Sequence, residues 1–117
     1  MDIKTYIKEA SRTSAVLDTK WQDEMHYVMG MVTEVGELMD VYKKELAYDK
    51  PMDVINMAEE IGDLMWYIAN YCRVMGFDFE EILEKNIAKL KARYPEKFTA
   101  DKANHRDLEK ERKILEQ

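Results

Sequence analysis

The sequence predicts an all-α fold, a helical bundle centred on a long antiparallel hairpin of two helices. Only 4 Gly and 2 Pro occur in 117 residues, which favours long regular elements, and Glu, Lys, Leu, Met and Ala, all good helix formers, are abundant. Apolar residues recur at spacings of three and four in several long segments. No segment alternates with the two-residue period of a β-strand.

The first half of the chain predicts two helices. Residues 2–18 form a weak amphipathic pattern, and residues 23–46 form a strong one. The long helix is expected to end at Tyr48-Asp49-Lys50-Pro51, because the residue before a proline avoids helical geometry. Its main apolar stripe consists of Met25, Val28, Met29, Val32, Val35, Met39, Tyr42 and Leu46.

The second half predicts three further helices. A second long helix starts at Met52 or Asp53 and is expected to end at Gly76. Asp78 is a suitable N-cap for the next helix, which stops before Tyr94-Pro95. A last, highly charged helix can be capped by Thr99 or Asp101.

Length and charge limit the class of protein. A chain of 117 residues predicts one domain, with residues 1–22 and 99–117 as peripheral helices or arms. The net charge of −6 argues against a nucleic-acid-binding surface. Cys72, the only cysteine, can form no intrachain disulfide, so the cytoplasm is the expected compartment. No apolar run is long enough for a membrane span or a signal peptide, so no membrane partner is expected.

Two short acidic motifs dominate the predicted hairpin. They are Glu34-Val35-Gly36-Glu37 and Glu60-Ile61-Gly62-Asp63, and both cross-pairs of acids are centred between Tyr48 and Asp49. If the chain turns there, Glu37 and Glu60 reach the same height, roughly 17 Å from the turn. Glu34 and Asp63 then meet one helical turn further along. The spacing therefore predicts that four carboxylates converge.

Solvated surface acids are the plain alternative, because Glu34 and Glu37 lie opposite the main apolar stripe. However, the acidic sides of the two helices are not purely polar. They also carry Tyr27, Gly30 and Val41 on the first helix and Asn56, Tyr67 and Asn70 on the second. Helices that are apolar on more than one side indicate oligomeric packing, which would partly enclose the acids.

Gly36 and Gly62 occupy helix interiors, where each costs about 1 kcal/mol relative to alanine. Close helix approach is the expected reason for both glycines.

An enclosed cluster of carboxylates is unfavourable unless some are protonated or a multivalent cation neutralises them. We therefore expect a metal site formed by Glu34, Glu37, Glu60 and Asp63. A purely oxygen donor set favours Mg²⁺, with Mn²⁺ as the alternative. A di-iron site is disfavoured because no Glu-x-x-His motif is present.

Candidate substrate-binding residues lie outside these motifs. Asn86, Lys89 and Arg93 share one helix face and could hold phosphates, although a solvated helix flank is the plain alternative. Lys44 is a weaker candidate of the same kind. Trp21-Gln22 could pair a stacking surface with an amide for a base edge, whereas Trp66 and Cys72 are expected in the core.

The two motifs, Glu34-x-x-Glu37 and Glu60-x-x-Asp63, followed by Asn86-x-x-Lys89-x-x-x-Arg93-Tyr94, resemble the MazG-like branch of the all-α nucleoside triphosphate pyrophosphohydrolases. The resemblance covers residues 24–98. It implies hydrolysis of a nucleoside or deoxynucleoside triphosphate between the α- and β-phosphates, giving the monophosphate and pyrophosphate. It also implies a homodimer or homotetramer with the site near a subunit interface, and removal of unwanted nucleotides from the pool is the expected role.

Roles can be assigned to the candidate residues. Glu34 or Glu37 could orient or deprotonate the attacking water, and Glu59, beside Glu60, could also position it. Lys89 and Arg93 would bind the leaving pyrophosphate, and Tyr94 completes the downstream pattern among the substrate-binding candidates.

Two alternatives remain open. One is a different reaction of the same superfamily, such as that of phosphoribosyl-ATP pyrophosphohydrolase or a dUTPase-like activity. The other is a non-catalytic helical oligomerisation or antitoxin-like module, which predicts indifference to metal.

Overall fold

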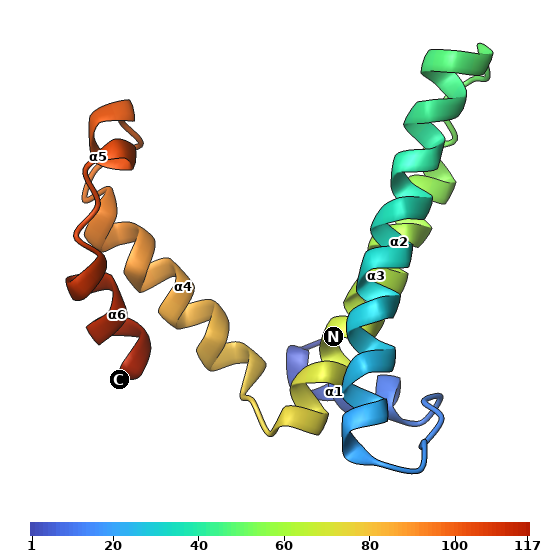
Figure 1. Ribbon diagram of the computed structural model, residues 1–117, viewed down its shortest axis with the longest axis horizontal. Coiled ribbons are helices and arrows are strands. Elements are labelled where there is room, and N and C mark those ends of the chain that lie inside the picture. The colour runs from blue at the N-terminus through green and yellow to red at the C-terminus, as the bar shows by residue number, and fades with distance from the viewer. The chain divides into compact units, whose positions relative to one another are not determined.

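The computed structural model describes all residues from 1 to 117 and contains only helices and loops (Figure 1). The all-α prediction is confirmed. The helices are α1 (Ile3–Ser11), α2 (Lys20–Tyr48), α3 (Val54–Met75), α4 (Phe79–Arg93), α5 (Ala100–Asn104) and α6 (Leu108–Glu116). They form two compact units, Met1–Phe77 and Asp78–Gln117, which are described separately. The assignment of residues 1–117 to one domain stays a prediction.

The first unit is built on α2 and α3, which lie side by side and run in opposite directions (Figure 1). A capping box starts α2, since Thr19 Oγ1 accepts from Gln22 N and Gln22 Oε1 accepts from Thr19 N, both at 3.1 Å. The helix ends at Asp49, which has a left-handed φ of 51°. Asp53 then caps α3 through Asn56 N at 3.0 Å.

Local signals set most other helix ends. Gly76 terminates α3 with a φ of 71°, and Asp78 caps α4, as the sequence predicts. Two expectations are wrong. The first helix stops at Ser11, because the Ser11 and Thr13 hydroxyls bond back to the carbonyls of Lys8 and Ala10 and compete with helical bonds. The last predicted helix is two helices, since Asp107 caps a new one.

The core of the first unit lies where α2 faces α3. Tyr27 and Asn70 are each only 1% exposed, and Arg73 Nη2 donates to the Tyr27 hydroxyl at 3.1 Å. Ser14 also contacts this hydroxyl, so the loop before α2 is tied to the same core. Trp66 donates its indole N–H to Thr13 Oγ1 at 2.9 Å, which ties α3 to the loop after α1.

Helices α2 and α3 approach one another closely at Gly30. A Cβ atom there would lie 2.1 Å from Cε1 of Tyr67, so no larger residue fits without moving the ring. Within this chain the expectation for Gly36 and Gly62 is wrong, because a Cβ at either position would meet no atom within 4 Å beyond its chain neighbours and its own helix backbone. Their places in the helices are not explained by packing inside the chain.

The main apolar stripe of α2 faces away from α3. Val32 and Met39 are 67% and 66% exposed, and the other members are exposed as well. The face with the acids is the one that packs on α3, through Tyr27, Gly30 and Val41. The apolar stripe correctly predicts that this segment is a helix, but it does not predict which face of α2 is buried against α3.

In the second unit, α4 and α6 lie side by side (Figure 1). Arg93, at the end of α4, and Arg106, before α6, both form ion pairs with Glu111 of α6. None of the six helices combines the length and apolarity needed to cross a bilayer.

Candidate functional site

Three of the acids converge between α2 and α3. Glu34, Glu37 and Glu60 can each offer a carboxylate oxygen such that all three oxygens lie within 4.8 Å of one another. Glu34 and Glu37 are neighbours because they are three residues apart on α2, and Glu60 faces them from α3. Asp63 lies outside this group. It is exposed one turn further along α3. The pKa of Tyr6 is raised, first by burial of the Tyr6 side chain and second by the negative charge of Asp63.

The three acids differ in burial. Glu60 is only 5% exposed, Glu34 is half-buried and Glu37 is exposed. Asn56 Nδ2 donates to Glu60 Oε1 at 3.1 Å and so holds one of its oxygens in place. Oε2 of Glu60 and Oε2 of Glu34 are buried and receive no hydrogen bond from any amide, hydroxyl or cation. Such unsatisfied oxygens are costly unless a proton or a cation compensates them.

The electrostatics of the cluster point the same way. The neighbouring Glu60 carboxyl is the largest cause that raises the pKa of Glu34 to about 7, followed by burial and by the charges of Glu37, Asp63 and Glu60. Glu60 also raises the pKa of Glu37. Two carboxyl groups can share a hydrogen bond only if one carries a proton. Near neutral pH the cluster therefore keeps a proton or exchanges it for a cation.

The donor set fits a hard divalent cation. Glu34, Glu37 and Glu60 offer only oxygen atoms, which Mg²⁺ and Mn²⁺ prefer. The exposed side of the cluster, at Glu37, leaves space for water or phosphate oxygens. Mg²⁺ typically keeps such ligands rather than accepting an all-protein cage.

Four of the predicted substrate-binding residues, Asn86, Lys89, Arg93 and Tyr94, belong to the second unit, on α4 and at its end. Asn86 is exposed and Lys89 is half-buried. Arg93 is bound to Glu111 at 2.6 Å, and its guanidinium carbon lies 5.6 Å from the centre of the Tyr94 ring. Sequence reasoning missed Glu111, which is eighteen residues away and has no local signal that links it to Arg93.

Comparison with known proteins decides the family. Residues 22–98 match the family model for the MazG nucleotide pyrophosphohydrolase domain. The chain belongs to this family. The matched segment contains both acidic motifs and residues 86–94, in agreement with the resemblance seen in the sequence.

A phage protein is similar to this MazG domain. The chain is 30% identical over 73 residues to the Gene 37 protein of Mycobacterium phage L5. The aligned region covers 58% of this chain and 63% of the phage protein. The chain therefore spans somewhat less than two thirds of the length of this relative. No solved structure matches the MazG chain.

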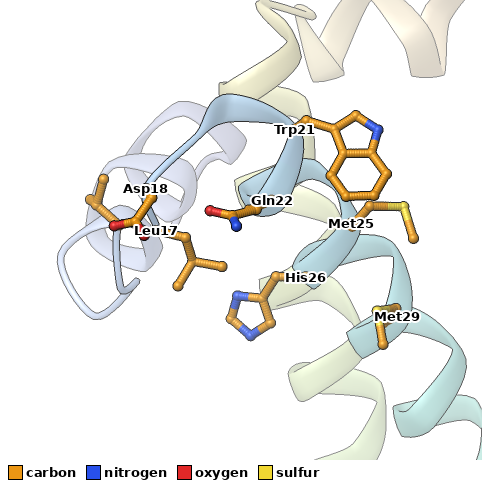
Figure 2. Close-up of a pocket in the computed structure, with 8 residues that line it drawn as sticks. Leu17, Asp18, Trp21, Gln22, Met25, His26 and Met29 are labelled. Carbon is orange, nitrogen blue, oxygen red and sulfur yellow. The ribbon is translucent and has the colours of Figure 1, made fainter.

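A cavity of about 490 Å³ lies at the start of α2 in this MazG domain (Figure 2). Gln22 and His26 lie on the side of the helix near Leu17, whereas Trp21, Met25 and Met29 project from the other side. The lining consists of Val16, Leu17, Asp18, Trp21, Gln22, Met25, His26 and Met29. Nδ1 of His26 is buried without a hydrogen-bond partner, a feature that sequence reasoning did not find.

The structure separates Trp21 from Gln22. Trp21 is 65% exposed, while the Gln22 carbonyl is engaged in the capping box. Because neighbouring residues on a helix point about 100° apart, the two side chains do not present one continuous surface, although both line the cavity.

The remaining candidates on the MazG hairpin stand apart from the three acids. Lys44 pairs with Asp40 at 2.9 Å and lowers the pKa of that carboxyl. Glu59 is exposed beside Glu60. Neither residue belongs to the converging group.

Proposed function

We propose that this MazG family member hydrolyses a nucleoside or deoxynucleoside triphosphate to the monophosphate and pyrophosphate in a metal-dependent reaction. The observation that carries the proposal is the meeting of Glu34, Glu37 and Glu60, with two buried carboxylate oxygens that lack a donor. A divalent cation would neutralise the negative charge of this cluster, and phosphate chains are typical ligands of such cations.

Glu34, Glu37 and Glu60 would hold the ion, which is Mg²⁺ in this proposal, with Mn²⁺ as its substitute. Asp63, one turn along α3, is proposed as a further ligand. Mg²⁺ bound here would supply positive charge to the phosphate oxygens as negative charge develops in the transition state. Asn56 supports the site by fixing one oxygen of Glu60.

The attacking water requires a carboxylate that can reach it. Glu37 is exposed, and the pKa of Glu34 is raised to about 7, close to the value that suits a general base near neutral pH. These two residues are the proposed bases, and the exposed Glu59 is proposed to orient the same water.

The rest of the substrate needs separate recognition. The pocket lined by Trp21, Gln22 and His26 is proposed to take the base, with the exposed indole of Trp21 as the stacking surface. His26 precedes Glu34 by two helical turns on α2, roughly 12 Å, so one extended ligand could reach both. The proposed phosphate-binding residues are Lys44, Asn86, Lys89, Arg93 and Tyr94.

Self-association completes the proposal. The exposed stripe of α2, including Val32 and Met39, is a continuous apolar face that a second copy could cover. Gly36 lies between these two residues along the helix and has free space around it, so it would let a partner helix approach closely. The proposed assembly is a homodimer or homotetramer, and the proposed role is removal of unwanted nucleotides from the pool.

A substrate screen tests the activity. Purified full-length chain is incubated with each common NTP and dNTP, with Mg²⁺ or with a chelator, and pyrophosphate release is measured. We expect metal-dependent release with at least one nucleotide, loss of release in Glu37→Gln, and full release in Glu45→Gln, which removes an exposed acid of α2 outside the cluster. No metal-dependent product with any substrate would overturn the proposal.

A further inference from the structure

Two arginines of the second unit converge on one carboxylate. Arg93 donates from Nη2 at 2.6 Å and from Nε at 2.7 Å to Oε1 of Glu111, and Arg106 donates from Nε at 3.1 Å to Oε2. The side chain of Glu111 is 5% exposed, that of Arg93 15% and that of Arg106 40%. Both oxygens of a buried anion are thus held by cations from two different segments.

The charges of this network do not cancel. Two guanidinium groups surround one carboxylate, so the cluster has an excess of one positive charge. One ion pair, between Arg93 and Glu111, would be enough to link α4 to α6, so the second arginine is not needed for this link. Arg93 lies inside the segment that matches the MazG family, whereas Arg106 and Glu111 lie beyond residue 98. The family match therefore assigns no role to the position between the two arginines.

The geometry suits a phosphoanion as well as a carboxylate. A guanidinium fork pairs with two oxygens of either group, and it does so with similar distances. An anion that replaced the Glu111 carboxylate would meet Arg93 along its Nε and Nη2 edge and Arg106 through Nε. The position is already shaped for an oxyanion, because the protein places one there.

The helix that supplies Glu111 has few other anchors. α6 has only nine residues; of its apolar side chains, Leu108 and Leu115 are 63% and 42% exposed and Ile114 is half-buried. A helix this short is marginal without tertiary contacts. Displacement of Glu111 would therefore release α6 at the loss of the partial burial of one apolar side chain, Ile114.

We propose that Arg93 and Arg106 form a binding site for pyrophosphate that Glu111 occupies as an internal competitor. The inference rests on the proposed function, in which Arg93 meets the leaving pyrophosphate. The C-terminal helix then limits access of phosphate groups to Arg93, and the phosphoanion that takes the site frees α6 from α4.

Calorimetric titration of the full chain with inorganic pyrophosphate, in chelator, tests this site without the metal centre. Glu111→Gln keeps the shape and one acceptor oxygen but removes the competing charge, so we expect binding tighter by about tenfold. Arg106→Gln added to this variant should reverse the gain. Glu116→Gln is the matched control, since it removes an exposed carboxylate of α6 paired with Arg112 at 2.6 Å, and it should bind as the wild type does.

Hydrogen exchange on the unmodified protein gives a second measurement, in case Glu111→Gln disturbs folding. Pyrophosphate in chelator should speed amide exchange in α6 and leave α2 unchanged. Equal or weaker pyrophosphate binding by a folded Glu111→Gln protein, or unchanged or slower exchange in α6, would overturn the proposal. Both measurements omit metal and turnover, so their failure is distinct from a failure of the hydrolase activity.

Discussion

Glu34 of α2 and Glu60 of α3 bring carboxylate oxygens within 4.8 Å of one another, and Oε2 of each residue is buried without a hydrogen-bond partner. The pKa of Glu34 is raised to about 7, first by the neighbouring Glu60 carboxyl. In the metal-free protein this pair is a source of instability that a proton or a cation relieves.

Replacing Glu60 by glutamine should stabilise the metal-free protein and abolish its response to Mg²⁺. The amide supplies the missing donor and removes one charge, so the midpoint of thermal unfolding in chelator should rise. Turnover should fall by about a hundredfold or more, because loss of a metal ligand should lower activity at least as much as loss of a residue that hydrogen-bonds to the ligand. Thermal scans with and without Mg²⁺ check this, and a variant that is still stabilised by Mg²⁺ as the wild type is would refute the assignment.

The stability of the metal-free protein should fall as pH rises from 4.5 to 7. A carboxyl whose pKa is higher in the folded state than in the unfolded state holds more protons when folded. The free energy of unfolding therefore decreases between the ordinary pKa of Glu34 and its raised value. Denaturant titrations in chelator across this range measure the slope, and Glu34→Gln should flatten it. A slope of the opposite sign in the wild type would contradict the prediction.

Gly30→Ala and Gly36→Ala should change stability in opposite directions. A Cβ at position 30 would lie 2.1 Å from the Tyr67 ring, so alanine there should cost about 1–3 kcal/mol in the free energy of unfolding. A Cβ at position 36 would meet no atom within 4 Å beyond its chain neighbours and its own helix backbone, so alanine there should raise the free energy of unfolding of a single chain by up to about 1 kcal/mol. Chemical denaturation at low protein concentration compares the two variants. Equal changes in the free energy of unfolding would show that the Tyr67 ring can move aside without a measurable cost.

A charge on the outer stripe of α2 should weaken self-association and leave the chain folded. Val32 and Met39 contact little within the chain, being 67% and 66% exposed, so Val32→Glu and Met39→Glu should preserve helicity. Analytical ultracentrifugation should show a shift toward monomer. Ile55→Glu, a change at an apolar residue of α3 that is 84% exposed, is the control. Unchanged sedimentation of both stripe variants would place the interface elsewhere.

Helix ends were predictable wherever a single residue sets the backbone. Gly76 and Asp78 act as the sequence predicts, and the chain reverses at Asp49 just before Pro51. The break after Ser11 was not predictable from hydrophobic spacing, because it depends on hydroxyl bonds to Lys8 and Ala10 that compete with the helix. The pairing of Arg93 with Glu111 was equally hidden, since it joins two separate helices.

The sequence by itself determined the two long helices, the turn between them and the register that brings Glu37 level with Glu60. These properties follow from spacing along one chain and from residues that fix their own backbone. Only the tertiary structure decided which side of α2 is inside: Tyr27, Gly30 and Glu34 face α3, and the more apolar stripe faces out. The reason is that periodicity defines the faces of a helix, whereas burial depends on the partner. Here the close fit of Gly30 to Tyr67 and the buried Tyr27 select the acidic face.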